Sequence, residues 1–551
     1  MFVPKLFTTL SGYDRKAFGR DLGAGVIVGV VALPLAIAFA IASGVTPDKG
    51  LITAVVAGFI ISALGGSRVQ IGGPTGAFVI IVYGIVQKYG IDGLIITTFL
   101  AGIVLVIFGL AKLGTAIKFI PAPVIIGFTS GIAVIIFTSE IPDFLGVRFD
   151  NPPAHFLAKW ALYLSSFGSV NFYAVGIALL TLLIIVLWPR INKTIPSPFV
   201  ALVISTGVVS LFHIPIETIG SRFGAIPTML PHPHMPHVTL AAIRELTPSI
   251  FTVAILAAVE SLLSAVVADG MIGSKHRSNM ELIAQGIANI GSAAFGGIPA
   301  TGAIARTATN VRSGGRTPIA GIIHAITLLL IMLLLGQLAS TIPLAVLAAI
   351  LVVVAYNMSE WHAFVEVFRA PKSDLAVLLA TFFLTVLVDL TVAVEVGMVL
   401  AAFLFMHRMA QVTNVRPFTS EIEEPQSETD AIRPAKLPLP DGVMIFDVSG
   451  ALFFGAAEQF AETINSLHAF PRVLVLRMAD VLAVDASGLK VLRDLHHRAM
   501  VHHSTLLITE LHAQPLVASQ RAGLLELIGE ENIHATLEDA IAQSRVIRAE
   551  H

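Results

Sequence analysis

The sequence contains no cysteine and little charge. Without thiols, a disulfide framework and a thiolate metal site are both excluded. Asp, Glu, Lys and Arg make up 13% of the 551 residues, whereas apolar residues make up 55%, a balance that no soluble chain of this length has. The basic residues are scattered rather than gathered into a stripe, so we expect no nucleic-acid partner.

Apolar runs of nearly membrane-spanning length recur from Val26 to Met406. We count about fourteen segments, which start near residues 22, 50, 74, 92, 121, 171, 198, 247, 281, 302, 316, 342, 373 and 391. With the N-terminus inside, the inner loops hold most of the loop Lys and Arg residues. This pattern predicts a multi-pass membrane protein with both the N-terminus and the C-terminal part in the cytoplasm.

The composition changes after Met409. Glu and Pro dominate the stretch from Thr419 to Asp441, which is typical of a solvated linker. Short apolar strands then alternate with helical stretches. We therefore predict a membrane domain over 1–412, a linker over 413–440 and a small α/β domain over 441–551.

Two short signatures occupy corresponding places in the two halves of the membrane domain. The stretch 72–78 (GGPTGAF) resembles 296–304 (GGIPATGAI), at an offset of 296 − 72 = 224. Ile120-Pro121 matches Ile342-Pro343, at an offset of 342 − 120 = 222. Each half holds seven segments, so the second copy enters the membrane from the opposite side, which predicts an inverted repeat.

Each of these signatures is too interrupted for a full spanning helix. Such backbone occurs in a membrane only where it is buried in protein or lines a watery cavity. If each signature begins a half-helix at mid-membrane, the free N–H groups at Thr75–Ala77 and Gly302–Ile304 face one another and form an anion site. The alternative is that these glycines only permit close helix packing.

Two charged residues lie at membrane depth. Arg306 is one turn into the second half-helix, where it either attracts the anion or is a structural arginine paired with a carboxylate. Glu260 interrupts the apolar run from Ile250 to Val267, and proton coupling is its natural functional interpretation. A hydrogen-bonded structural carboxyl, or a sodium ligand acting with Ser264, remains open. The three histidines of 231–237 are interpreted as solvated rather than metal-binding.

Four motifs resemble the SulP family of anion transporters, the sulfate-transporter and prestin group. They are Gly73-Pro74-Thr75-Gly76; Glu260-Ser261-Leu262-Leu263 with Ala268-Asp269-Gly270; Ser278-Asn279 with Glu281 and Gln285-Gly286; and Phe295-Gly296-Gly297 with Ala305-Arg306. The resemblance implies a polytopic α-helical fold of seven-plus-seven inverted repeats, in which a core moves against a gate like an elevator. Carried over by position, the implied substrate residues are Phe39, Thr75, Gly76, Ala77, Phe78, Gly302, Ala303, Ile304 and Arg306.

The same resemblance places the coupling-ion site at Glu260 and Ser264. Cyanobacterial bicarbonate carriers resemble this chain but have a sodium-ligating aspartate at that position, so the glutamate here favours protons. Leu35 and Ala305 stand where many relatives have Gln and Ser, which leaves more of the binding to backbone N–H groups. A homodimer is also implied by the family.

The C-terminal part resembles a STAS domain, similar to bacterial anti-sigma-factor antagonists. Asp485-Ala486-Ser487-Gly488 matches the loop whose serine is phosphorylated in those proteins. Phosphorylation of Ser487 is therefore a candidate regulatory event, and retention of the loop for folding alone is the alternative. A cytoplasmic protein partner of this domain is a further expectation.

The sequence as a whole predicts a secondary transporter rather than an enzyme, with no cofactor and no metal. We expect proton symport of a C4-dicarboxylate, with sulfate and bicarbonate as the next candidates, because the overall similarity is greatest to the bacterial branch linked to dicarboxylates. The rival functions are a sodium-coupled symporter, an anion exchanger, an uncoupled anion channel and a membrane-tethered anion sensor that signals through the STAS domain.

Overall fold

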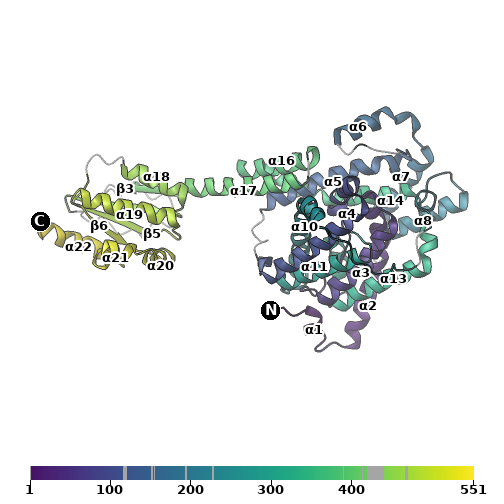
Figure 1. Cartoon of the computed structure of the whole chain (residues 1–551), viewed down its shortest axis with the longest axis horizontal. Coiled ribbons are helices and arrows are strands. Elements are labelled where there is room, and N and C mark those ends of the chain that lie inside the picture. The colour runs from purple at the N-terminus through teal and green to yellow at the C-terminus, as the bar shows by residue number, and fades with distance from the viewer. Residues whose placement is uncertain are drawn as a thin grey trace. The chain divides into compact units, whose positions relative to one another are not determined.

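The computed structural model describes residues 2–115, 121–149, 153, 156–192, 195–225, 229–388, 390–412, 414–417, 440–465 and 470–550. Contacts divide the chain into two compact units, Met1–Val399 and Leu400–His551 (Figure 1). The first is almost entirely helical, whereas the second contains a sheet. The expected linker 413–440 lies largely outside the described residues, so its boundaries stay a prediction.

The first half of the helical unit consists of long helices connected by turns and short helices. Its elements are α1 (Lys5–Thr9), α2 (Arg15–Ala42), α3 (Pro47–Leu64), α4 (Gly76–Leu110), α5 (Ala122–Leu145), α6 (Phe156–Ser165), the 3-10 helix η2 (Phe167–Ser169), α7 (Phe172–Ile191), α8 (Ser197–Phe212) and α9 (Ile219–Phe223). Helix α4 is two helices joined at Gly90, whose φ of 69° only glycine adopts readily.

The second half repeats this plan. Its elements are α10 (Leu240–Ile272), α11 (Ser278–Ala294), α12 (Ile304–Arg312), α13 (Pro318–Ala339), α14 (Leu344–Met358), α15 (Trp361–Glu366), the 3-10 helix η3 (Val367–Arg369), α16 (Lys372–Leu387) and α17 (Leu390–Val412). Proline at the first or second helical position starts α3, α5, α8 and α13, where its missing N–H has no helical partner to lose.

All fourteen expected segments are helical. Nine helices in the described part of the chain are long and apolar enough to cross a membrane, with α4 supplying two of the expected segments. The remaining four segments are the shorter helices α8, α11, α12 and α16. Helix α12 has nine residues, which confirms that the second interrupted segment is too short to span a bilayer.

The packing of the helices confirms the seven-plus-seven repeat. Helix α2 packs against α13 as its repeat counterpart α10 packs against α4, and α5 packs against α16 as its counterpart α14 packs against α7. These contacts form two groups within the unit. The core comprises α2, α3, α4, α10, α11, α12 and α13, and the gate comprises α5, α7, α8, α14 and α16. Helix α17 belongs with the gate, because a Cβ atom on its Gly397 would lie 2.4 Å from Thr381 Oγ1 of α16.

The core is held together by very close helix contacts. Gly102 on α4 and Gly286 on α11 face each other, and a Cβ atom on either would lie 2.6 Å or 2.5 Å from the carbonyl oxygen of the other. Small residues permit this approach. In lipid there is no hydrophobic driving force between helices, so the van der Waals packing that the approach allows stabilises the pair. This pair explains why α4 and α11 pack so closely in the core.

The C-terminal unit contains a five-stranded sheet in the order β3-β4-β5-β6-β7, with β3–β4 antiparallel and the other pairs parallel. Its strands are β3 (Asn414–Pro417), β4 (Val443–Ser449), β5 (Val473–Asp480), β6 (Thr505–Thr509) and β7 (Ile533–His534). Its helices are α18 (Phe454–Asn465), α19 (Ala486–Val501), α20 (Ala513–Arg521), α21 (Leu524–Ile528), the 3-10 helix η5 (Glu530–Asn532) and α22 (Leu537–Glu550).

Alternate residues of these strands face two separate apolar clusters. One cluster contains side chains of α18, α19 and α21, and the other contains side chains of α22. A sheet covered on both faces by helices is the expected result of parallel strand pairs joined by helical crossovers. The predicted α/β domain is therefore confirmed.

Candidate functional site

The two interrupted segments meet in the middle of the core. The two-residue strand β1 (Gly72–Gly73) pairs antiparallel with β2 (Thr301–Gly302), and the Ala303 N–H donates to the Ile71 carbonyl at 2.8 Å. Helix α4 begins directly after β1, and α12 begins directly after β2. The starts of the two half-helices are therefore neighbours, although more than two hundred residues separate them in the sequence.

Buried side chains satisfy the non-helical backbone around this crossing. The Ile71 N–H donates to Thr307 Oγ1 at 3.0 Å, and Asn310 Nδ2 donates to the Val69 carbonyl at 2.8 Å. Gln70 Nε2 donates to the Ser261 carbonyl on α10 at 3.1 Å. Extended backbone in a membrane requires such partners, and here Thr307 and Asn310 of α12 supply them, while α10 holds the Gln70 side chain.

Gly302 is required at this crossing. A Cβ atom added to it would lie 1.7 Å from Gln70 Nε2, a group that is buried and already hydrogen-bonded. We predict that Gly302→Ala lowers the free energy of unfolding by about 1–3 kcal/mol through overpacking. Thermal unfolding in detergent measures this effect. Gly84→Ala on α4, where an added Cβ meets nothing within 4 Å, is the control and is expected to leave the stability unchanged or raise it by up to about 1 kcal/mol.

Arg306 lies beneath the crossing and is 2% exposed. Its Nη2 donates to the Pro74 carbonyl of the other half-helix, while Nη1 is buried without a partner. Within the described ranges of the chain, no carboxylate forms an ion pair with its guanidinium. Of the two alternatives left by the sequence, a structural arginine paired with a carboxylate therefore receives no support.

Glu260 contacts the start of the first half-helix directly. Thr75 is the N-cap residue of α4, but its hydroxyl does not cap its own helix and instead donates to Glu260 Oε2 at 3.0 Å. One turn along α10, Ser264 donates to Thr307 Oγ1 at 3.2 Å. The structure thus joins Glu260 to the α4 terminus and engages Ser264 with α12 rather than with Glu260.

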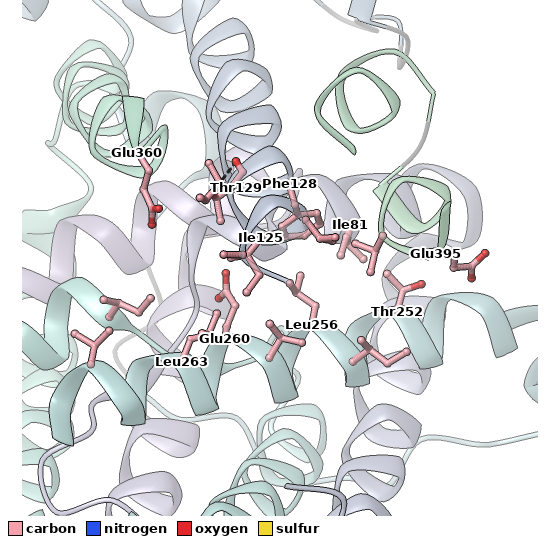
Figure 2. Close-up of a pocket in the computed structure, with 18 of the residues that line it drawn as sticks. Ile81, Ile125, Phe128, Thr129, Thr252, Leu256, Glu260, Leu263, Glu360 and Glu395 are labelled. Carbon is pink, nitrogen blue, oxygen red and sulfur yellow. Dashed lines mark hydrogen bonds between the residues drawn. The ribbon is translucent and has the colours of Figure 1, made fainter. Parts of the chain in front are cut away.

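A cavity of about 340 Å³ lies beside Glu260, between core and gate helices (Figure 2). Figure 2 shows Glu260 and Glu360 pointing into it from opposite sides. The described lining residues include three carboxylates, Glu260, Glu360 and Glu395, two hydroxyl residues and no cation. The other lining residues are Ile81, Ala122, Val124, Ile125, Ile126, Phe128, Phe251, Ile255, Leu256, Val259, Leu263, Val267, Ile304 and Val394, all apolar.

The predicted substrate residues lie differently around this cavity. Ile304, the first residue of α12, is 42% exposed and lines it. The start of α4 is covered instead, because a Cβ on Gly76 would meet the Met358 and Ile136 side chains of the gate and the Phe39 ring at 2.7–3.3 Å. The other predicted substrate residues are buried and do not line the cavity; they are Ala77, Phe78, Gly302, Ala303 and Arg306.

Several site residues were missed by sequence reasoning. Glu360 and Glu395 both line the cavity, and the sequence pattern assigns neither of them to the site. Glu360 has a φ of 43°, which is unusual for a residue other than glycine, and no sequence signal reveals it. His324 on α13 is fully buried, and neither of its ring nitrogens has a hydrogen-bond partner among the described residues.

The sequence of this chain matches the models of two known protein families. The model of the sulfate permease family matches residues 18–381. The chain belongs to the sulfate permease family. It is therefore a transporter of this membrane family rather than an enzyme. A STAS-domain model matches residues 435–540, in agreement with the α/β fold of the C-terminal unit.

Individual relatives support the same assignment. A Bacillus subtilis protein named "Putative sulfate transporter YvdB" is 43% identical over 524 residues, covering 95% of this chain and 97% of the relative. The bicarbonate transporter BicA of Picosynechococcus is 32% identical over 461 residues, covering 81% of each chain.

Solved structures show the same fold. The structure of SLC26A9 matches with a TM-score of 0.87 at 19% identity, covering 99% of this chain and 93% of that chain. The transmembrane domain of a cyanobacterial BicA matches with a TM-score of 0.63 at 33% identity, covering 69% and 98%.

The histidine-rich stretch 231–237 of this chain forms neither a helix nor a strand. The His234 N–H donates to the Ala294 carbonyl at the end of α11. Among the described residues, no group of three or more His, Cys, Asp or Glu side chains could hold a metal ion.

Ser487 of the STAS domain is half-buried in the first turn of α19. The N-cap residue Asp485 accepts a hydrogen bond from the Gly488 N–H at 2.8 Å and another from the Phe454 N–H at 3.2 Å. The loop therefore has a folding role that does not depend on phosphorylation, and phosphorylation of Ser487 stays a prediction.

We predict that an acidic side chain is tolerated at Ser487. Ser487→Asp places negative charge at a helix N-terminus, so the stability of α19 should change by less than about 1 kcal/mol. Hydrogen exchange of α19 in the full-length chain measures the change. Ser544→Asp, at a fully buried serine of α22, is the contrast and should destabilise the domain strongly.

Proposed function

We propose that this chain is a proton-coupled symporter of small anions, with a C4-dicarboxylate as its leading substrate and sulfate and bicarbonate as the next candidates. The anion binds in the cavity beside the paired starts of α4 and α12, where Ile304 and Glu260 line it, while Glu260 is protonated. The core then moves relative to the gate and carries both across the membrane. The relatives named for sulfate and for bicarbonate transport support an anionic substrate.

The observation that carries this proposal is the hydrogen bond from Thr75 to Glu260. Thr75, which precedes the electropositive start of α4, is in direct contact with Glu260, and Glu260 lines the cavity. A charged Glu260 repels an anion at that terminus, whereas a neutral Glu260 does not. Anion binding and protonation of Glu260 therefore favour each other, which is the linkage that symport requires.

The character of the cavity supports both parts of the proposal. Its described lining has three carboxylates and no cation, so an anion gains little there until a proton is bound. Its apolar walls suit the hydrocarbon spacer of a C4-dicarboxylate better than they suit a fully hydrated ion. Arg306 adds a positive potential from behind the helix termini.

Sodium coupling receives less support. A hard cation requires several oxygen ligands around one point. Ser264, the expected second sodium ligand, is fully buried, and its hydroxyl donates a hydrogen bond to Thr307. We propose protons as the coupling ion for this reason, and we retain the homodimer, the inner membrane and the cytoplasmic placement of the STAS domain as parts of the same proposal.

Uptake into proteoliposomes tests the proposal. Purified full-length protein is supplied with labelled succinate, sulfate or bicarbonate, with and without an inward proton gradient, and in the presence or absence of sodium. We expect succinate to accumulate only with the proton gradient and irrespective of sodium. Uptake of every anion that ignores the gradient, or that requires sodium, contradicts proton symport.

A further inference from the structure

A second cavity, of about 320 Å³, lies on the face of the membrane unit where α2 and α5 end. We call it the outer chamber. Its walls come from both groups of helices, because Ile41, Ala42 and Tyr83 belong to the core, whereas Ser139, Glu140 and Lys159 lie on or beside the gate. Nothing in the transport site described above uses these residues.

Most charges around the outer chamber are paired. Arg222 forms an ion pair with Asp143, with 2.8 Å between Nη1 and Oδ1, and a second one with Glu217. Arg148 lies 3.6 Å from Glu217, and its side chain is 65% exposed, so the chamber reaches the surface there. Among the described lining residues, these pairs leave one cation, Lys159, and one carboxyl, Glu140.

Lys159 is buried, with 7% exposure, and its ammonium has few partners. Nζ lies 3.5 Å from Ser139 Oγ and 5.1 Å from the centre of the Tyr83 ring. In the part of the chain that the structure describes, no carboxylate pairs with it, and Glu140 is no exception although both side chains are buried. Glu140 acts on this ammonium only from beyond ion-pair distance, so the ammonium has unused hydrogen-bonding capacity directed at the chamber.

We propose that the outer chamber is a second anion site, which binds a small carboxylate or oxyanion on Lys159. The volume holds ions up to the size of a C4-dicarboxylate. Tyr163 lines the same chamber, and burial raises the pKa of its hydroxyl to about 12, so this hydroxyl keeps a proton that it can donate. Because Tyr83 and Lys159 come from opposite walls, a bound anion contacts core and gate together.

The site weakens as the pH rises. Burial lowers the pKa of Lys159 below that of an ordinary lysine, with Glu140 opposing the shift, so the ammonium is lost earlier on the alkaline side. Ionised Glu140 repels the anion, and its protonation at lower pH removes that repulsion. The other ionisable groups that line the chamber are Tyr83 on α4, Glu140 and Asp143 on α5, Tyr163 one turn along α6, Arg222 on α9 and Arg148.

Trp160 reports on this site, because it follows Lys159 in α6 and its ring lies 6.4 Å from that of Tyr163. With Trp188→Phe and Trp361→Phe, it is the single tryptophan of the full-length chain. We expect a saturable change in its fluorescence on titration with sodium succinate or sodium sulfate at constant ionic strength. Lys159→Gln should weaken this binding at least about 10-fold, and Lys159→Arg should retain it.

Arg244→Gln removes an exposed cation from the start of α10 and is the matched control, with unchanged affinity. Glu260→Gln should also leave the signal unchanged, which separates the outer chamber from the transport site. If Lys159→Gln does not fold, Tyr163→Phe replaces it and should weaken binding several-fold. A Lys159→Gln affinity equal to that of the parent, or loss of the signal in Glu260→Gln, overturns the proposal.

Discussion

Replacement of Glu260 by glutamine is expected to abolish accumulation driven by a proton gradient. Each pH unit supplies about 1.4 kcal/mol per proton, so a one-unit gradient concentrates succinate about tenfold in the parent protein. Glutamine keeps a side-chain oxygen for the Thr75 hydroxyl, so the contact at 3.0 Å survives while the titratable group is lost. The variant should therefore bind succinate and exchange it across the membrane without concentrating it.

The control is Glu395→Gln, which changes another carboxyl of the same cavity. Glu395 has no contact with the half-helix termini among the described contacts, so this variant should accumulate succinate like the parent. Labelled uptake with a clamped membrane potential measures both variants. Gradient-driven accumulation by Glu260→Gln, or an equal loss in Glu395→Gln, contradicts the assigned role of Glu260.

Arg306→Gln is expected to weaken succinate binding without lowering stability. A hydrogen-bonded charge contributes about 1.5–3 kcal/mol, so its loss near the helix termini should raise the dissociation constant about 10- to 100-fold. The ligand-free protein should melt at the same temperature or higher, because a buried charge with no ion-pair partner costs stability.

Arg312→Gln, at the exposed end of the same helix, is the matched control and should change neither quantity. Isothermal titration and thermal unfolding of the two variants separate the possible roles of Arg306. A lower melting temperature with unchanged affinity for succinate assigns Arg306 a structural role instead.

Much of the architecture could be predicted from the sequence, because lipid imposes strict rules on backbone hydrogen bonding. The fourteen segments and the inverted repeat follow from hydropathy, from interrupted signatures and from their offset. The meeting of 72–73 with 301–302 could also be predicted, since irregular backbone at membrane depth must find partners inside the protein.

The details of the site could not be predicted, because they depend on side-chain direction across the boundary between core and gate. Glu360 reaches the cavity through a left-handed backbone residue, and the gate residues Ile136 and Met358 cover Gly76 from distant parts of the chain. The partner of Thr75 likewise depends on the rotation of α10, which periodicity does not fix. Sequence spacing identified the right helices but not their contacts.

Proton uptake during anion binding tests the central claim most directly. Succinate is titrated calorimetrically into the full-length protein in buffers with different ionisation enthalpies, and the dependence on buffer gives the number of protons bound. The account predicts uptake of about one proton per succinate in the parent protein and none in Glu260→Gln. Succinate binding with no proton uptake in the parent, or with the same uptake in both proteins, contradicts the claim that Glu260 protonation and anion binding are linked.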